Sequence, residues 1–357
     1  MVTQNQVEVE VYGGIDTHAD THHVAVIDAL GRRLDDIQVP ATPAGYRTAV
    51  TFLQSQVGLV AVGIECTGSY GAGMTRAARN SGLEVVEVNQ PNRFDRRLRG
   101  KTDTFDAYSA AEAVLSGRAT AAPKGGDALV EALRVLRTSR SSALTARTAT
   151  INQIKGMLVT APAQLRSHYQ GLSNTKLIAA LAATRPSPVP VTALEATCYS
   201  LRLLARRWQM LTEQINDLAK HLERLLLEHA PALMAVFGAG RDTVAQLLIT
   251  AGDNPARLRS EAAFASLSGV CPVPASSGKT NRHRLNRAGD RQANSALYHI
   301  VMVRLRYDQA TKEYVARRTA EGRTKMEIIR CLKRYVVRQL YPLICEALKP
   351  AKVTAAA

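Results

Sequence analysis

The strongest constraint on the fold is that the strand signals of this 357-residue chain stop early. Runs rich in β-branched and apolar residues predict five strands, two within 7–28 and one each at about 34–39, 59–65 and 83–89. Helical patterns at 45–56 and 71–80 separate the later strands. Three successive strands followed by alternating helices and strands predict an α/β domain with a mixed sheet.

Beyond residue 123 the pattern is helical. An unbroken heptad repeat predicts a long helix with one buried seam of apolar side chains, namely Leu201, Leu204, Trp208, Leu211, Ile215, Leu218, Leu222 and Leu225. Its partner is either an earlier helix at about 128–159, whose own seam is interrupted by Arg140 and Arg147, or the same helix of a second subunit. The predicted organisation is an α/β domain over 1–123, a coiled-coil helical domain over 124–230 and a mostly α-helical domain over 231–350.

The chain is strongly basic, because 46 Lys and Arg against 30 Asp and Glu give a formal net charge of +16. Such an excess favours a polyanionic partner, since each phosphate that the protein neutralises releases condensed counterions. Aromatic residues make up only 5% of the chain, so we expect phosphate contacts rather than base stacking. The predicted nucleic-acid-binding residues are Arg93, Arg97, Lys101, Lys279, Arg282, Arg284, Arg287, Arg330 and Arg334, with Lys333 and Arg338 beside the last two.

Other features exclude several classes of protein. Five scattered cysteines without a CxxC pair argue against a disulfide framework and against a thiolate zinc site. No stretch reaches the roughly 18 apolar residues that a membrane span needs, and the N-terminus lacks the pattern of a leader peptide. We therefore expect a cytoplasmic protein without a membrane partner.

Carboxylates stand at the ends of two predicted apolar strands. Asp16 closes the first strand and Glu65 closes the strand at 59–65, where a charge is costly unless a cation neutralises it. Asp103 and Asp106 are three residues apart and hence on one face of a predicted helix. Four converging carboxylates need divalent cations, and their hard oxygen ligands select Mg²⁺, with Mn²⁺ as a possible substitute. This order of acids is typical of RNase H-like enzymes, in which two ions hold the attacking and leaving oxygens of a phosphodiester.

Three histidines, His18, His22 and His23, follow Asp16 closely. On two strands joined by a turn they lack a clear convergent spacing for a metal. We expect them at the surface or in contact with DNA rather than on zinc.

A second candidate site lies in the Gly- and Ser-rich loop at 266–280. Ser277 is followed by Gly278 and Lys279, so three consecutive residues provide a hydroxyl, a backbone that a phosphate can approach closely, and a positive charge. Taken alone, this segment is explained more simply as a loop that binds phosphate without chemistry.

Together these segments resemble the DEDD transposases of the insertion-sequence class numbered one hundred and ten, relatives of the Piv and MooV DNA invertases. The resemblance covers nearly the whole chain. The matching segments are 14–16, 65–70, 101–107, 152–158 and 267–278, with Asn294, Leu297, Tyr298 and His299 downstream.

The resemblance implies a RuvC-like (RNase H-fold) N-terminal domain, a coiled coil and a helical transposase domain that carries the nucleophile. It implies that Asp16, Glu65, Asp103 and Asp106 hold Mg²⁺, and that Ser277 attacks a DNA phosphate and remains as a phosphoserine ester. We assign this role to Ser277 rather than to the adjacent Ser276 because Ser277 precedes glycine. The resemblance also implies guidance by a structured non-coding bridge RNA. Two DNA sites must be brought together, so we expect a homodimer or homotetramer.

Three other functions are compatible with parts of this pattern. A junction-resolving endonuclease would use the carboxylates and a metal-activated water, and would have no use for Ser277. An actin-like phosphotransferase would require Asp-x-Gly after its first strand, whereas Asp16 is followed by Thr17 and His18. A nucleic-acid-binding protein without activity would leave the complete set of acids unexplained.

Overall fold

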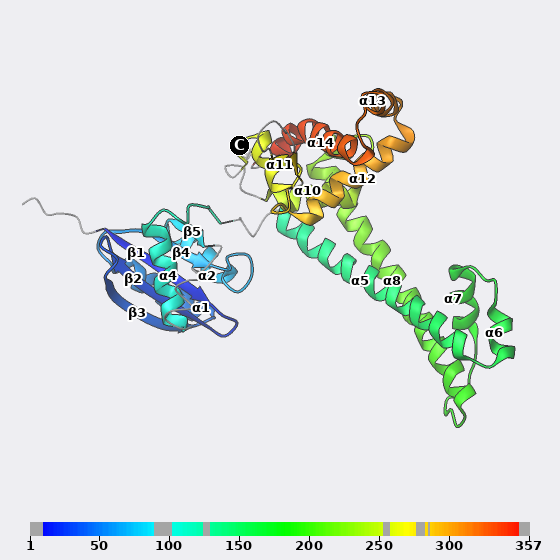
Figure 1. Ribbon diagram of the computed structural model, residues 1–357. Coiled ribbons are helices and arrows are strands. Elements are labelled where there is room, and N and C mark those ends of the chain that lie inside the picture. The colour runs from blue at the N-terminus through cyan, green and yellow to red at the C-terminus, as the bar shows by residue number, and fades with distance from the viewer. Residues whose placement is uncertain are drawn as a thin grey trace, which may run out of the picture. The chain divides into compact units, whose positions relative to one another are not determined.

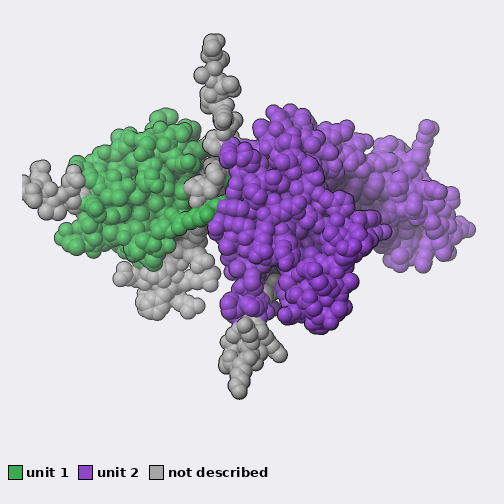
Figure 2. Space-filling view, turned by 90° about the horizontal axis from the view of Figure 1, so that it is seen from above, with its two compact units in different colours: residues 1–128, 252–259 green, residues 129–251, 260–357 purple. Residues whose placement is uncertain are grey.

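The computed structural model describes residues 10–88, 102–123, 129–252, 258–275, 283–284 and 286–349. The chain divides into two compact units, shown in different colours in Figure 2, which comprise 1–128 with 252–259 and 129–251 with 260–357. The predicted division into three domains stays a prediction.

The first unit contains the mixed sheet that the sequence predicts. Its strands have the order β3-β2-β1-β4-β5, and helices accompany them in the described part of the unit (Figure 1). β2 pairs with β1 and β3 in antiparallel fashion, whereas β1 with β4 and β4 with β5 are parallel. The elements are β1 (Val11–Thr17), β2 (Thr21–Asp28), β3 (Arg33–Pro40), α1 (Pro43–Gln54), β4 (Leu59–Glu65), α2 (Ala72–Asn80), β5 (Val85–Val88) and α4 (Asp103–Leu115).

Helices cover both faces of this sheet, and alternation along the strands assigns each residue to one face. Ile15 on β1 and Ile64 on β4 belong to the core formed with α1 and α2. Ala25 and Ile27 on β2 pack instead against α4. The even-numbered residues of β1 and the odd-numbered residues of β4 therefore lie on the α4 face, so both strands point their last acid, Asp16 or Glu65, to the same side.

α4 approaches β1 so closely that Gly14 has no room for a side chain. A Cβ at Gly14 would lie 2.1 Å from the carbonyl oxygen of Ala107 and 2.3 Å from the amide nitrogen of Ala111, both in the backbone of α4. Gly63 on β4 is similarly confined, with the carbonyl oxygen of Ala110 at 2.7 Å. Glycines on two neighbouring strands thus allow the helix to lie directly on the sheet.

This close contact predicts a large effect of adding one methyl group. We expect Gly14→Ala to lower the free energy of unfolding by about 3 kcal/mol, because α4 must move away from β1. Gly68→Ala is the matched control: within the described part of the chain no neighbouring atom lies within 4 Å of its added Cβ, and its effect should stay within about 0.5 kcal/mol. Urea unfolding of both variants measures the difference, and equal stability would contradict the described packing.

The described residues of the second unit are helical apart from one short hairpin and the connecting loops. α5 (Leu129–Thr160) and α8 (Ala193–His229) run side by side, with α6 (Ala163–Tyr169) and α7 (Asn174–Ala183) at one end of the pair (Figure 1). The remaining elements are α9 (Pro231–Met234), α10 (Arg241–Ala251), α11 (Glu261–Leu267), β6 (Val273–Pro274), β7 (His283–Arg284), α12 (Arg291–Tyr307), α13 (Gln309–Ala320) and α14 (Lys325–Ala347).

α5 and α8 are antiparallel partners within one chain. Ala143 packs with Leu211 and Ile215, whereas Ile154 packs with Leu201, further back along α8. Half of the predicted seam is buried, and Ala205, Ala219 and Leu226 are buried where the heptad repeat did not place them. The coiled coil itself stays a prediction.

The arginines that interrupt the apolar seam of α5 have specific partners. The guanidinium carbon of Arg147 lies 5.4 Å from the centre of the Trp208 ring, a cation–π distance, and Arg140 forms an ion pair with Asp242 on α10. Both arginines therefore join helices within the second unit. No described helix is long and apolar enough to span a bilayer.

Candidate active site

Two of the predicted acids lie side by side at the carboxyl ends of parallel strands. Ile15 pairs in register with Ile64, so Asp16 and Glu65 occupy the next position on each strand. Both residues are buried, with 4% and 8% of their surface exposed, on the face that α4 covers. The hydroxyl of Thr17 donates a hydrogen bond to the carbonyl oxygen of Glu65 at 3.1 Å and joins the two strand ends.

α4 brings the other two acids to this edge of the sheet. Its N-terminal end lies over the carboxyl end of β1, because Gly14 faces Ala107 and Ala111 further along the helix. The side chain of Thr102 caps the helix by accepting a hydrogen bond from the Phe105 amide at 3.2 Å. Asp103 and Asp106 form the acidic first turn, where the helix dipole favours negative charge. Asp106 is 1% exposed.

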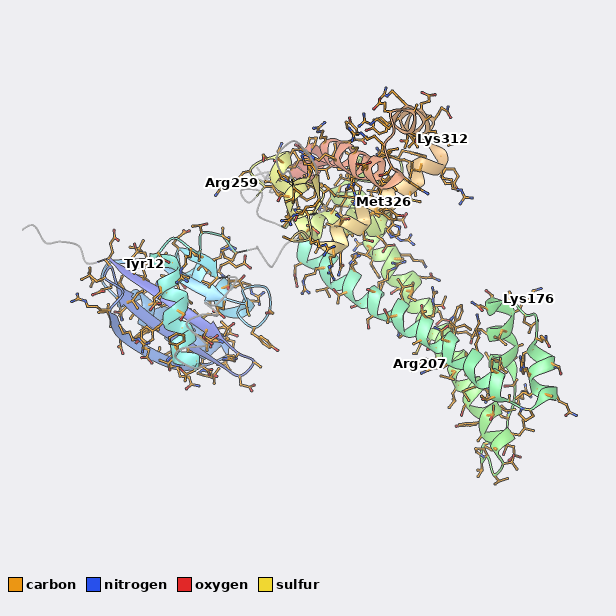
Figure 3. The ribbon with its side chains drawn as sticks, viewed as in Figure 1. Tyr12, Lys176, Arg207, Arg259, Lys312 and Met326 are labelled. Atoms are coloured by element: carbon orange, nitrogen blue, oxygen red, sulfur yellow. The ribbon has the colours of Figure 1, made fainter. Side chains whose placement is uncertain are left out.

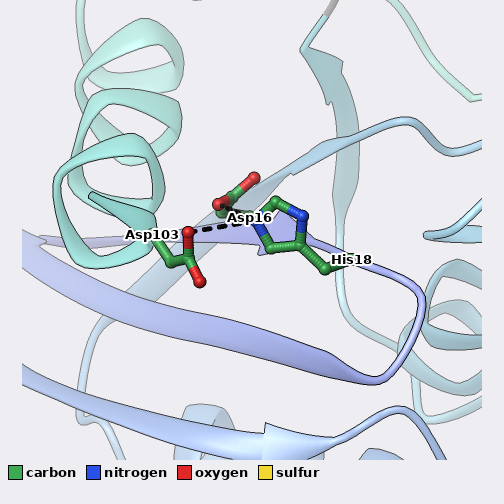
Figure 4. Close-up of side chains that lie close together, drawn as sticks. All are labelled: Asp16, His18 and Asp103. Carbon is green, nitrogen blue, oxygen red and sulfur yellow. Dashed lines mark hydrogen bonds and ion pairs between the residues drawn. The ribbon is translucent and has the colours of Figure 1, made fainter. Parts of the chain in front are cut away.

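His18 joins Asp16 to Asp103 (Figure 4). Its Nε2 lies 3.0 Å from Oδ2 of Asp16 and 3.2 Å from Oδ1 of Asp103. One ligand atom from each of these three residues lies within 4.8 Å of the others, and this is the metal-sized group found among the described residues. Glu65 and Asp106 flank the group without belonging to it.

Negatively charged side chains surround Asp16. Burial raises the pKa of its carboxyl group, and the nearby carboxylates of Asp106 and Asp103 raise this pKa further, while His18 acts in the opposite direction. A buried carboxylate beside two others favours binding of a cation, which relieves both repulsion and desolvation. The donor set of carboxylate oxygens and one imidazole fits a divalent ion.

A sharp turn follows Glu65. Cys66 has a φ of +51°, in the left-handed region that non-glycine residues rarely adopt. Its carbonyl oxygen accepts hydrogen bonds from the amides of Ser69 and Gly71 at 2.9 and 3.1 Å. Such local strain is common at functional sites, and here it ends β4 directly after its acid.

The three N-terminal histidines have separate surroundings. His22 is fully buried and stacks on Tyr46 at a ring-centre distance of 5.6 Å. His23 forms a 2.7 Å hydrogen bond with Asp36 on β3. The predicted placement at the surface or on DNA is therefore wrong for His22, whereas the side chain of His18 is 41% exposed and is the one of the three that reaches Asp16 and Asp103. The sequence signal for it is its position two residues after Asp16, directly beyond the end of β1, so that its side chain can turn back to the acid that ends the strand.

The second candidate site is only partly described. Ser276 and the predicted nucleophile Ser277 lie outside the described residues, as do Arg93, Arg97, Lys101, Lys279 and Arg282. Arg284 and Arg287 are exposed. Arg330 and Arg334, on α14, line a pocket together with Arg284, and Arg334 also forms an ion pair with Glu261 on α11.

Known proteins resemble both parts of this chain. The DEDD transposase family of IS110 elements matches residues 13–161, and the transposase family IS116/IS110/IS902 matches residues 230–316. An uncharacterized 43.6 kDa protein of insertion element IS110 from Streptomyces coelicolor is 25% identical, with 94% of each chain covered. An uncharacterized 42 kDa protein of insertion element IS900 from Mycobacterium paratuberculosis is also 25% identical, covering 97% of this chain and 99% of its own.

The mixed sheet, its buried acids and the two family matches define a DEDD transposase, an enzyme that cleaves DNA and transfers its strands. The chain belongs to the IS110 family of transposases. DNA is therefore its substrate.

Proposed function

We propose that this transposase cuts and rejoins DNA strands with an RNase H-like (RuvC-like) metal site and a serine nucleophile. The observation that carries the metal site is the group formed by Asp16, His18 and Asp103, with Glu65 at the neighbouring strand end and Asp106 in the first turn of α4 beside it. Asp16 and Asp103 hold the ion, with Glu65 and Asp106 beside them and His18 as a further ligand. A bound Mg²⁺, or Mn²⁺ in its place, would polarise the phosphodiester and favour ionisation of the attacking hydroxyl.

Ser277 is the proposed nucleophile. An attack by its hydroxyl oxygen forms a serine–phosphate ester and releases the hydroxyl end of the other strand segment, which takes up a proton. A second DNA hydroxyl then attacks the ester, restores a phosphodiester and returns the proton to Ser277. The number of phosphate ester bonds is unchanged at every step, so rejoining needs no ATP. The Ser-Gly-Lys sequence and the match of residues 230–316 support this role.

We further propose that a structured bridge RNA selects the DNA and that a homodimer or homotetramer brings two sites together. The net charge of +16 supports binding of several nucleic-acid strands at once. Sequencing of the RNA that co-purifies with the full-length protein tests the guide: one enriched structured species is expected. A mixture of RNAs in proportion to their cellular abundance would contradict the proposal that a bridge RNA selects the DNA.

Trapping of the protein on DNA tests the proposed chemistry. Incubation of the full-length protein with its element's DNA and Mg²⁺ should give a protein–DNA adduct that resists denaturation, and EDTA should prevent it. The junction-resolving alternative predicts cut DNA with free ends and no adduct.

The contact between His18 and both aspartates predicts a role in metal binding. We expect His18→Ala to weaken Mn²⁺ binding about tenfold to a hundredfold, as measured by calorimetric titration of the full-length protein. His221→Ala is the control, because His221 is an exposed residue of α8 that contacts Asp217 and lies outside the acid group. Equal Mn²⁺ affinity of the two variants would exclude His18 as a ligand.

A further inference from the structure

A basic pocket lies within the second unit. It has a volume of about 650 Å³ and is bounded by residues 269–272, by β7, and by helices α13 and α14. Many side chains on these two helices end in nitrogen (Figure 3). The lining includes a lysine, Lys333, and six arginines, while its one described carboxylate belongs to Glu327; the arginines are Arg284, Arg318, Arg323, Arg330, Arg334 and Arg338.

Carboxylates neutralise only part of this charge. Arg318 pairs with Glu321, Arg334 pairs with Glu261, and Arg323 lies 4.0 Å from Glu327. Within the described part of the chain, the other three arginines of the lining form no ion pair with an acid. The pocket therefore holds a local excess of positive charge.

Lys333 is the most deeply buried of the cations that line the pocket. It is 6% exposed, and burial, together with the nearby charge of Arg330, lowers the pKa of its ammonium group. Its Nζ donates one hydrogen bond of 2.8 Å to Oδ1 of Asn294 on α12, and no described carboxylate forms an ion pair with it. A buried ammonium without a negative partner is costly, and an anion bound in the pocket would remove that cost.

Asn294 connects Lys333 to the start of the loop that contains Ser277. Its Nδ2 donates hydrogen bonds to the carbonyl oxygens of Ser268 at 3.1 Å and Gly269 at 2.9 Å. Gly269 has a φ of +67°, which favours glycine. The buried lysine thus fixes the amide that holds this turn, eight residues before Ser277 in the sequence.

We propose that Lys333 binds a phosphodiester of a single DNA strand in this pocket, and positions the turn at residues 268–269 through Asn294. The size of the pocket suits a short stretch of backbone or one unpaired nucleotide rather than a duplex. Tyr335, half-exposed in the wall, offers a ring beside the cations, a combination typical of single-strand binding. DNA is the ligand because residues from both sides of the serine segment line the pocket, and this choice rests on the proposed function.

Binding of a labelled single-stranded DNA oligonucleotide by the full-length protein, freed of nucleic acid, tests this site without any cleavage. Lys333→Met should weaken binding about tenfold to a hundredfold and lower the salt slope, d log K/d log [salt], by about 0.7. Lys333→Arg should retain most of the binding affinity and most of the salt slope. Lys325→Met is the control, since it removes the same charge from an exposed position of α14 outside the pocket. Thermal unfolding verifies that each variant is folded.

The outcomes separate this site from the proposed chemistry. If Lys333→Met and Lys325→Met bind the DNA oligonucleotide with equal affinity and equal salt slope, the pocket is not its binding site, even where the serine adduct still forms. If Lys333→Met weakens binding only of an RNA oligonucleotide of the same sequence, the pocket binds RNA, and the proposal of a DNA site is also wrong. A specific loss on DNA supports the site even where no serine adduct is found.

Discussion

Asp16→Asn should reduce metal-dependent DNA cleavage at least about a thousandfold while leaving the protein folded. The expected loss follows from the several kcal/mol of charge stabilisation that a metal ion supplies in phosphoryl transfer. Asp16 is buried, lies in register with Glu65 and contacts His18 at 3.0 Å, so an amide there removes the central anionic ligand. Cleavage of labelled DNA over a Mg²⁺ titration measures the effect.

The same substitution should raise the melting temperature in EDTA. Burial and the neighbouring acids raise the pKa of Asp16, so the folded protein holds this proton more tightly than the unfolded chain does. Ionisation of Asp16 at neutral pH therefore costs folding free energy, and the uncharged amide avoids that cost. Asp20→Asn is the control in the exposed β1–β2 turn, and it should change neither cleavage nor stability. Full cleavage by Asp16→Asn, or in EDTA, contradicts the metal site.

The sheet and its acids are predictable from local patterns. Runs of β-branched residues predict the strands. Because successive side chains of a strand point to opposite faces, the positions along β1 and β4 then determine which face each acid occupies. The role of the glycines is harder to infer, because the confinement of Gly14 depends on a helix some ninety residues later in the sequence. The contact of His18 with Asp103 has the same origin. Periodicity reports the environment of one element, whereas these contacts arise from the packing of two.

The helical unit shows what a charge pattern leaves open. A basic run on α14 predicts phosphate contacts, but it does not predict that Lys333 is buried or that Arg334 forms an ion pair with Glu261. On α8 the buried positions include Ala205, whose small side chain packs against Ile151 and Ile154 of α5, a position that the leucine heptad did not predict. Net charge thus identifies the class of partner, while tertiary contacts decide which cations remain free to bind it.

Ser277→Ala should eliminate the covalent protein–DNA adduct and reduce strand transfer about a thousandfold or more, while DNA and RNA binding stay unchanged. The physical reason is that the ester to Ser277 keeps the cut end attached and reactive, whereas hydrolysis at the metal site would release it. Alanine removes one hydroxyl and no charge, so neither the phosphate contacts nor the salt dependence of binding should change.

Ser276→Ala is the matched control, because it removes the same group one residue earlier. It should keep the adduct, since Ser277 alone is followed by the glycine that lets a phosphate approach the backbone. Mass spectrometry of the peptide that contains both serines, taken from protein trapped on nicked DNA, identifies the attached residue. A nucleotide on Ser276 or on a tyrosine, or an adduct that persists in Ser277→Ala, would show that another group attacks the DNA.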